Sequence, residues 1–510
     1  MRATGTGAGD GVPVGAAHGV GVGTSGAVAS GVGTSAAVAT GPVAGSVGAH
    51  GVGRGARTSR GRRGWLVDAL AILLLGLVSV TLVGVHVATY QVISPIDEES
   101  HIDYTLRAPG WQPTVSGDRW LPETMREEAC RGKDRGRPAA RHCTSVPLDA
   151  ATFALGGYAS AYLHPPTYYD VTAVVGRGIQ RLFGLSSPVT GFRLVGVLWL
   201  WAGLTVTYRL GRLLGAARTA SVAVCVLIAA SPAVFYSDAI VNPDAASVLV
   251  GAFVCWAVLR WDRSRSRASW ALLVAAGVVS TGVKVQNGIV DLVPAGCLLL
   301  LAAWPLGGWV RRGRVGPVGW DRLGRRVGGV AVLGGSALAV AVAWTVLVTV
   351  NATLPPAKNP MSVKFTFTAL PPGALSRTLG QFVEPLERAY IPAAYASTWL
   401  SGAIAVATGL LLAGTVAAAL LGTRDRVHRA FAWPLLTVAA VGALLMTAAN
   451  WLLQHQYLPT ISQRYCLTLV PAFAVLLAVG VEHRAQRLAL AGVAAASGLV
   501  TVVVLLASAG

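Results

Sequence analysis

Long apolar runs recur along this chain from residue 66 onward, and they constrain its fold more than any other feature. A run of more than about 18 apolar residues with few charges is typical of a membrane-spanning helix. The chain is only 12% charged, whereas a soluble domain has about 25%. A soluble multidomain enzyme, a disordered chain and a collagen-like chain are therefore excluded. The sequence predicts an all-α polytopic membrane protein with 11 spans, at 66–92, 189–208, 219–237, 242–259, 268–286, 288–307, 327–350, 398–421, 430–453, 463–481 and 488–508.

The N-terminal segment 1–64 has a different composition, rich in Gly, Ala, Val, Ser and Thr and without Leu, Ile or aromatic residues. Such a segment cannot bury enough apolar surface to offset its ordering entropy, so it is predicted to be disordered. Glycine interrupts its apolar residues throughout, which excludes a signal peptide in the tail. The run 66–92 has no small-residue cleavage site and is too long for the apolar region of a signal peptide, so it is predicted to be a retained anchor. The predicted organisation is a tail, 1–64, and a membrane domain, 65–510.

The basic residues are distributed unevenly between the two sides of the predicted membrane. If the tail is cytoplasmic, 24 of the 41 Lys and Arg residues fall in cytoplasmic segments. This is the positive-inside pattern, and it predicts a multi-pass protein of the cell membrane with a cytoplasmic N-terminus and an extracytoplasmic C-terminus. The net charge of +19 then needs no nucleic-acid partner, because it orients the chain in the bilayer.

Two outside loops are long, and long structured loops usually carry function. Loop 93–188 is nearly neutral, with 10 basic and 11 acidic residues, and loop 351–397 is rich in proline. Apolar residues follow helical spacing in 171–183 and, more weakly, in 374–390. Such amphipathic stretches are too short and too charged to span a membrane, so they should lie at its surface.

The densest polar motif, S-P-I-D-E-E-S-H-I-D-Y, occupies residues 94–104, directly outside the first span. Pro95 stops the helix, which places the acidic run at the outer membrane surface. Asp97, Glu98 and His101 could supply a general base or a divalent-metal site. The alternative is a solvated acidic start of a loop, although carboxylates at a membrane boundary are costly unless they are used.

Two further motifs are rich in aromatic residues or proline. In Y-L-H-P-P-T-Y-Y (162–169), the Pro-Pro pair fixes an extended backbone and presents His164 and Tyr168 in set directions. Considered alone, this motif favours an interfacial aromatic belt. Asn-Pro-Asp at 242–244 is typical of a turn and helix N-terminus, where Asp244 stabilises the positive helix end.

Two cations occur in outside links that are otherwise free of basic residues. Arg464, in Gln463-Arg464-Tyr465, precedes the tenth span, and Lys284 follows the fifth. A guanidinium at the level of the lipid headgroups suits bidentate binding of a phosphate. Each cation could instead contact lipid phosphate without any part in catalysis.

The six cysteines do not form a disulfide scaffold or a metal-binding spacing. Cys130 and Cys143 both lie in the first outside loop, on the oxidising side of the membrane. A disulfide between them is predicted to stabilise the loop by about 3 kcal/mol, with two free thiols as the alternative.

Four of these motifs, in their order along the chain, resemble a known family. Residues 94–104 resemble the P-x-D-E-x-x-H-x-x-Y signature of the bacterial membrane proteins called the domain-of-unknown-function 2142 family. The segments L-H-P-P-T-Y-Y, V-N-P-D-A and S-Q-R-Y-C-L-T-L-V-P are similar to the same family. That family is in turn similar to the GT-C glycosyltransferases, including the protein O-mannosyltransferases. The mannosyltransferases read D-E-x-H where this chain reads D-E-x-x-H, so His101 departs from their pattern by one residue.

The resemblance implies a GT-C-like enzyme that takes a sugar from a polyprenyl-phosphate donor, usually with inversion. It implies that Asp97 is the general base, with His101 assisting, and that Glu98 orients the acceptor or binds a metal ion. No cofactor is certain, and a divalent metal ion at Asp97 and Glu98 is the one candidate. Arg464 would hold the donor phosphate, with Lys284 as second candidate. The pocket between loop and membrane would be formed by His164, Tyr168, Asp244, Gln463 and Tyr465.

The leading hypothesis is therefore a membrane glycosyltransferase that modifies a cell-envelope glycan, lipid or protein on the extracytoplasmic side. The main alternative is a transporter or flippase for a polyprenyl-linked glycan, and another is a non-catalytic membrane protein. Transporters place ionisable groups near the bilayer midplane and often contain internal repeats. Here the acidic residues gather at the outer edge, which favours the transferase and predicts that Asp97, Glu98 and Arg464 line one site.

Overall fold

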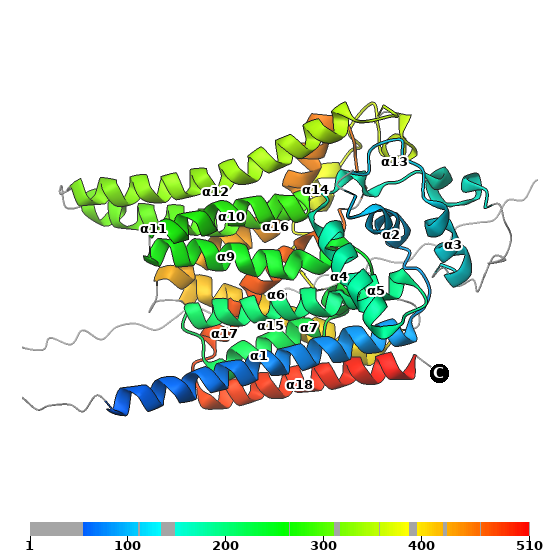
Figure 1. The fold of residues 1–510 in the computed structure, drawn as a ribbon. Helices are drawn as coiled ribbons and strands as arrows, with labels where there is room; N and C mark the ends of the chain where they lie inside the picture. The colour runs from blue at the N-terminus through cyan, green and yellow to red at the C-terminus, as the bar shows by residue number, and fades with distance from the viewer. Residues whose placement is uncertain are drawn as a thin grey trace, which may run out of the picture. The chain divides into compact units, whose positions relative to one another are not determined.

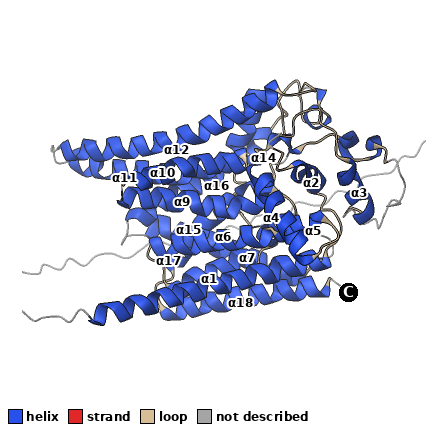
Figure 2. Ribbon diagram, viewed as in Figure 1, coloured by secondary structure: helices blue, strands red, loops and turns tan. Residues whose placement is uncertain are grey.

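The computed structural model describes residues 55–110, 113–133, 148–264, 266–310, 317–355, 358–386, 395–421, 426–459 and 461–508. Within these ranges the chain is helical and contains no β-strand (Figure 2), as the apolar runs predict. The segment predicted to be a disordered tail lies outside the described residues up to residue 54, and residues 55–64 belong to the first helix.

Long helices build the membrane part of the molecule (Figure 1). They are α1 (Gly55–Thr89), α6 (Gly196–Leu213), α7 (Arg218–Ala229), α9 (Ser247–Ser264), α10 (Arg267–Val283), α11 (Leu292–Val310), α12 (Pro317–Val350), α15 (Thr398–Leu421), α16 (Arg426–Gln454), α17 (Val470–Gly480) and α18 (Arg484–Ala507).

Shorter elements connect these helices. The α-helices among them are α2 (Glu98–Arg107), α3 (Pro122–Arg131), α4 (Thr167–Phe183), α5 (Pro188–Leu194), α8 (Pro232–Ala239), α13 (Pro360–Val363) and α14 (Ala374–Thr378). The 3-10 helices are η1 (Ala150–Thr152), η2 (Ala154–Gly157), η3 (Ala161–Leu163), η4 (Pro243–Ala246), η5 (Val285–Asp291) and η8 (Gln463–Leu469).

Nine helices of the described chain are long and apolar enough to cross a membrane, and the bent pair α7–α8 makes a tenth if it counts as one span. The remaining predicted segment, 268–286, forms α10, which is apolar but shorter. The predicted span 219–237 is broken by a bend of 66° between α7 and α8. Pro232 explains the break, because proline lacks an N–H and is favoured in the first turn of a new helix.

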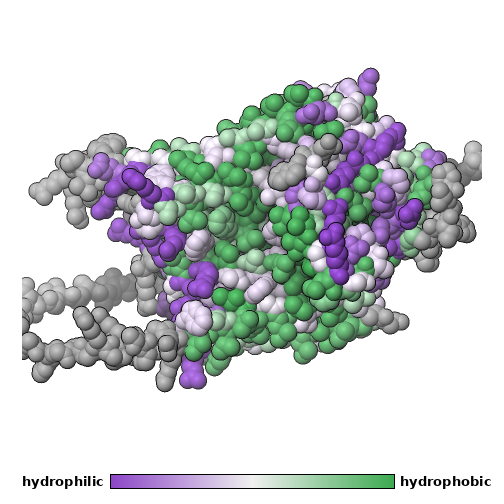
Figure 3. Space-filling view, in the orientation of Figure 1, coloured by the Kyte–Doolittle hydropathy of each residue, from purple (hydrophilic) through white to green (hydrophobic). Residues whose placement is uncertain are grey.

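The surface of the bundle matches a membrane environment. Exposed side chains of α1, α12 and α18 include many Leu and Val residues. Figure 3 shows hydrophobic residues over the middle of the bundle and hydrophilic residues at both ends. A belt of this kind identifies a multi-pass membrane protein, because apolar side chains cost nothing when they face lipid.

One end of the bundle carries the structured loops. Helices α2, α3, α4 and α13 gather there, and α18 ends at the same end (Figure 1). The amphipathic stretch 171–183 lies in α4, where Val171, Val174, Leu182 and Phe183 are exposed. The stretch 374–390 is helical only in α14 within its described part. Its helix ends early because Leu379 is extended and Gly380 adopts a positive φ of 76°.

Three spans begin with a 3-10 helix: η4 precedes α9, η5 precedes α11 and η8 precedes α17. The turn η8 contacts both η4 and η5. Gly251 of α9 allows the close approach, since a Cβ there would lie 1.9 Å from the carbonyl oxygen of Thr468 in η8. Charged residues lie in or beside these turns: Asp244 in η4, Lys284 directly before η5, and Arg464 in η8.

Candidate active site

Asp97 precedes the first residue of α2 and has a left-handed backbone, with φ 60° and ψ 18°. Asp tolerates this conformation better than most residues do. Its backbone carbonyl accepts hydrogen bonds from the N–H groups of Ser100 and His101. The carboxylate makes no capping bond to the helix and is 48% exposed. It is therefore directed away from α2 and is accessible to solvent.

Arg464 lies between Asp97 and a second carboxylate. Its Nη2 is 3.4 Å from Oδ2 of Asp97, and its Nε is 3.4 Å from Oδ2 of Asp244. Its Nη1 also donates to the carbonyl oxygen of Ile96, at 3.5 Å. The Arg464 side chain is 14% exposed, whereas that of Asp244 is 1% exposed. Asp244 thus anchors the guanidinium from the buried side, and Asp97 meets it from the accessible side.

Lys284 completes this group beneath Arg464. Its ammonium forms an ion pair with Oδ1 of Asp244 and lies 4.4 Å from the centre of the Tyr465 ring. The side chain of Lys284 is 2% exposed. We define Asp97, Asp244, Lys284, Arg464 and Tyr465 as the charged cluster. It contains two carboxylates and two cations, so the opposite charges in the cluster are equal in number.

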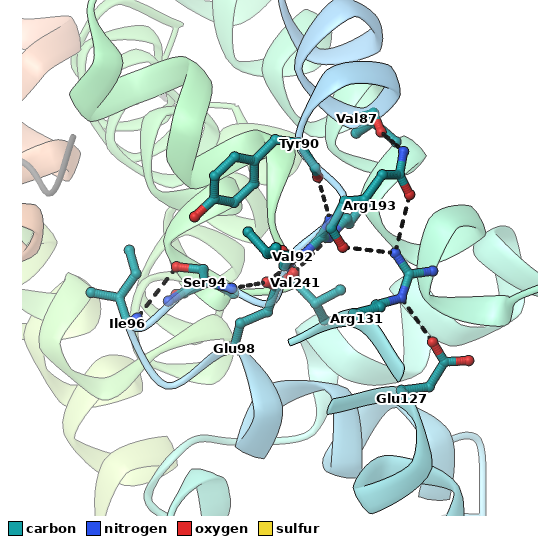
Figure 4. Close-up of polar contacts among 12 residues, drawn as sticks. Val87, Tyr90, Val92, Ser94, Ile96, Glu98, Glu127, Arg131, Arg193 and Val241 are labelled. Atoms are coloured by element: carbon teal, nitrogen blue, oxygen red, sulfur yellow. Dashed lines mark hydrogen bonds and ion pairs between the residues drawn. The ribbon is translucent and has the colours of Figure 1, made fainter. Parts of the chain in front are cut away.

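Glu98 lies next to Asp97 in sequence but is directed elsewhere. Its carboxylate is fully buried and pairs with Arg193 of α5, at 2.7 Å between Oε2 and Nη2 (Figure 4). It also accepts hydrogen bonds from the backbone N–H groups of Ser94 and Val241. These partners leave no accessible carboxylate for an acceptor or a metal ion, so the structure departs from the role expected for Glu98.

His101, one turn into α2, faces α4 and the turn before it. Its Nδ1 is 2.8 Å from the Tyr169 hydroxyl, and its ring centre is 5.6 Å from that of His164. Burial lowers the pKa of both histidines well below 6.5, and the positive charges of Arg464 and Lys284 lower each pKa further. The two imidazoles are therefore neutral beside the charged cluster and can act as hydrogen-bonding groups rather than as cations.

The other predicted pocket residues support the backbone around the cluster. The Tyr168 hydroxyl accepts from the backbone N–H of Asn242, and burial raises the pKa of this phenol above its usual value. The side chain of Asn242 accepts from the N–H of Asp244, so Asn242 caps η4 and Asp244 is left for the ion pairs. Gln463 donates to the carbonyl oxygen of Gln381, which ties η8 to the second long loop.

The carboxylates at the start of α2 do not fit a divalent cation. Glu98 is bound to Arg193 and two N–H groups, and the one near partner of Asp97 is the guanidinium of Arg464. A metal ion needs several free oxygen ligands. In the described part of the chain, no group of three or more His, Cys, Asp or Glu side chains could hold one.

Cys130, at the end of α3, is disulfide-bonded. Its predicted partner, Cys143, lies outside the described residues. Cys225, Cys255, Cys297 and Cys466 are free and buried among the helices, as expected for small core residues.

Sequence reasoning missed two residues beside the site, Arg193 and Tyr169. A single arginine inside the predicted span 189–208 was a signal, because a buried guanidinium needs a partner. Its partner, Glu98, is 95 residues away, and no local pattern identifies such a pair. Tyr169 stands next to Tyr168 in the aromatic motif, and nothing in the sequence distinguishes which of the two contacts His101.

No family model matches the chain, and no curated protein matches it. Among solved structures, the chain is similar to ArnT from Cupriavidus metallidurans bound to undecaprenyl phosphate, with 15% sequence identity and a TM-score of 0.43. The match covers 82% of this chain, which spans 60% of the length of that protein. The resemblance of the four motifs to the 2142 family stays a prediction, and the roles of individual residues rest on the geometry described above.

Proposed function

We propose that this protein is a membrane glycosyltransferase that moves a sugar from a polyprenyl-phosphate donor to an acceptor hydroxyl on the extracytoplasmic side. One observation carries the proposal. The half-exposed carboxylate of Asp97 lies 3.4 Å from a guanidinium that a buried carboxylate holds in place. A base for the acceptor and a cation for the donor phosphate thus stand side by side, as this transfer requires.

In the proposed reaction, the acceptor oxygen attacks the anomeric carbon while Asp97 takes the hydroxyl proton. The bond between the anomeric carbon and the phosphate oxygen breaks, and its electron pair stays on the departing polyprenyl phosphate. Arg464 stabilises the negative charge that develops there. Its contact with Asp97, at 3.4 Å, is longer than a strong charge-assisted hydrogen bond. A phosphate can therefore take over the guanidinium and leave the Asp97 carboxylate available as base.

Asp244 and Lys284 have supporting parts in this proposal. Both side chains are almost fully buried and paired with each other, so neither reaches an incoming phosphate easily. Asp244 faces Nε of Arg464 from the buried side, and Nη2 is the terminal nitrogen that meets Asp97 on the accessible side. Lys284 and Arg464 together balance the negative charges of the two carboxylates, Asp97 and Asp244. Arg464 is thus the proposed phosphate ligand. Lys284 pairs with Asp244, and Asp244 in turn contacts Arg464.

The proposal that transfer takes place on the extracytoplasmic side rests on the charges of the loops. Along the chain, the short Arg-rich loops alternate with the loops at the end of the bundle that contains the charged cluster. The positive-inside rule therefore assigns the end with the charged cluster to the outside. The exposed apolar side of α4 fits the membrane surface, and the preceding His-Pro-Pro turn brings His164 beside the cluster. A donor with its lipid in the bilayer would place its phosphate at this level.

The test compares cells that carry wild-type protein, Asp97→Asn or no protein. Envelope glycans, lipids and proteins are analysed by mass spectrometry, together with lipid-linked sugars. Loss of the base should abolish one envelope modification and let its lipid-linked donor accumulate. Glu123→Gln, at an exposed carboxylate of α3, is the matched control. An Asp97→Asn strain with wild-type glycans would overturn the proposal.

The bent pair α7–α8 favours a second candidate, a transporter or flippase of a polyprenyl-linked glycan. Asp238 is buried in α8, and broken helices with buried ionisable groups are typical of transporters. Purified protein in vesicles distinguishes the two functions. A flippase moves the lipid-linked sugar across the bilayer without breaking its phosphate bond and depends on Asp238, whereas a transferase consumes the donor and depends on Asp97.

A further inference from the structure

Arg193 is the most completely bonded charged residue near the site. Its side chain is 1% exposed, and its Nε and Nη2 donate to the two carboxylate oxygens of Glu98 at 2.8 and 2.7 Å. Nη1 donates to the carbonyl of Tyr90 at 2.9 Å, and Nη2 to that of Val92 at 2.7 Å (Figure 4). A planar fork matched to a carboxylate fixes direction as well as distance.

Glu98 extends these contacts to two other segments. Oε2 accepts from the N–H of Ser94 at 2.7 Å, and Oε1 accepts from the N–H of Val241 at 3.0 Å. The Arg193–Glu98 pair therefore joins α5 to three other pieces of chain: the exit from α1, the start of α2 and the turn that leads into η4. Every polar atom of the Glu98 carboxylate has two donors, so the pair has one geometry.

These attachments lie next to both carboxylates that contact Arg464. Asp97 directly precedes Glu98, and Asp244 comes three residues after Val241. The left-handed backbone of Asp97 is one that residues with a side chain adopt less readily than extended or right-handed conformations, so neighbouring contacts help to hold it. A buried ion pair adds little net stability compared with apolar residues of similar volume. What it can contribute is the choice of a single arrangement of the chain segments that it joins.

We propose that Glu98 and Arg193 are positioning residues that hold Asp97 beside Arg464. This inference rests on the proposed function and assigns Glu98 a part that touches neither acceptor nor metal. The pair acts on the reaction through the placement of Asp97. Asp244 keeps its own contacts with Lys284 and Asn242 when the pair is lost, so the guanidinium of Arg464 stays in place. Its loss should therefore lower turnover more than donor binding.

Two variants test the pair in different ways. In Glu98→Gln, one carboxylate oxygen becomes an amide nitrogen that faces two N–H donors. The variant therefore loses the two hydrogen bonds at that atom with almost no change in side-chain volume. Arg193→Lys keeps the charge, but one ammonium cannot serve both carboxylate oxygens and two carbonyls. Either variant alone suffices if the other fails to fold.

The ion pair of Arg326 and Asp262 offers a matched control. It is also bidentate, with both N–O distances at 3.1 Å, and it joins α12 to α9 away from the charged cluster. Asp262→Asn and Arg326→Lys thus remove the same kind of interaction from the same bundle. Melting temperature is measured for all four variants, so that loss of stability and loss of turnover can be separated.

Turnover is measured in vesicles with the lipid-linked sugar that accumulates in Asp97→Asn cells, and ground-state binding with undecaprenyl phosphate. Glu98→Gln and Arg193→Lys should lower kcat by about tenfold or more and leave the Kd for undecaprenyl phosphate within about threefold. The control variants should keep kcat within about twofold at a similar loss of melting temperature. In an Asp97→Asn background, Glu98→Gln should have no further effect on transfer.

Each other outcome contradicts something specific. If Glu98→Gln and Arg193→Lys lower only the melting temperature, as the controls do, the pair is structural and the inference is wrong. A higher Kd with unchanged kcat also overturns it, because the pair would then serve binding. If no lipid-linked sugar accumulates in Asp97→Asn cells and wild-type protein transfers none, the proposed function fails, and the inference fails with it.

Discussion

Asp97 and Arg464 are 367 residues apart in the chain, and their side chains meet at 3.4 Å. The nearby Glu98–Arg193 pair is closer, at 2.7 Å, and fully buried. The difference corresponds to two functions of an ion pair. The buried pair has no space to open, whereas the half-exposed Asp97 can give up its partner to an incoming anion. Asp97 and Glu98, adjacent in one acidic motif, thus differ: the ion pair of Asp97 can open, whereas that of Glu98 stays closed.

Replacing Arg464 tests whether its guanidinium binds the donor phosphate. Arg464→Lys keeps one positive charge but loses the bidentate fork, so the Kd for undecaprenyl phosphate should rise by about tenfold. Arg464→Gln should raise it further, because it leaves Asp244 with one partner fewer. Binding is measured by calorimetry in detergent. If Arg181→Gln, at an exposed arginine of α4, weakens binding as much as Arg464→Gln does, general surface charge and not Arg464 determines affinity.

Most of the architecture could be predicted from the sequence. Hydrophobicity alone locates the nine helices of the described chain that are long and apolar enough to span a membrane, because lipid requires long apolar helices. The break at Pro232 was not predicted, because an apolar run of the right length obscures the proline. The gathering of Asp97, Lys284 and Arg464 follows from topology, since each begins or ends a span on the same side.

The partners of individual side chains could not be predicted. Glu98 and Asp97 look equivalent in the sequence, yet one is buried against Arg193 and the other is half exposed. Glu98 is bound by Arg193 and by the N–H of Val241, both far from it in the sequence, whereas Asp97 has a left-handed backbone and meets Arg464. Long-range packing decides this, and a single sequence contains no signal for it.

The stability of the outer loops should depend on pH through Glu99. Burial raises the pKa of this carboxyl from 4.5 to about 7, although Lys133 beside it acts in the opposite direction. A raised folded-state pKa stabilises the protein below pH 4.5, and this contribution is lost as pH rises to about 7. Glu99→Gln should remove that dependence.

Melting temperatures of wild-type protein and Glu99→Gln between pH 4.5 and 8 measure the effect. The wild type should lose stability relative to the variant as pH rises, and the two should run parallel above pH 8. Glu123→Gln, at an exposed position of α3, should follow the wild type throughout. Parallel curves for Glu99→Gln and wild type over the whole range would contradict the prediction.

Gly251 should be required for the close contact between α9 and η8. In Gly251→Ala, the new methyl would lie 1.9 Å from the carbonyl oxygen of Thr468, so η8 and Arg464 must move. Overpacking of this kind costs about 1–3 kcal/mol, and both melting temperature and transfer should fall. Gly409→Ala is the control, because a Cβ at that helical position meets nothing within 4 Å. Wild-type activity in Gly251→Ala would show that η8 need not be held so closely.

The disulfide of the first outside loop should stabilise α3 and its surroundings. Cys130 is disulfide-bonded, and Cys143 is its predicted partner. Cys130→Ser, Cys143→Ser and the double variant should each lower the free energy of unfolding by the same amount, about 3 kcal/mol, because either change breaks one bond. Unfolding of the three variants and of wild type is followed with and without reductant. Reductant should affect the wild type alone, and additive losses in the double variant would show that the two cysteines are not bonded to each other.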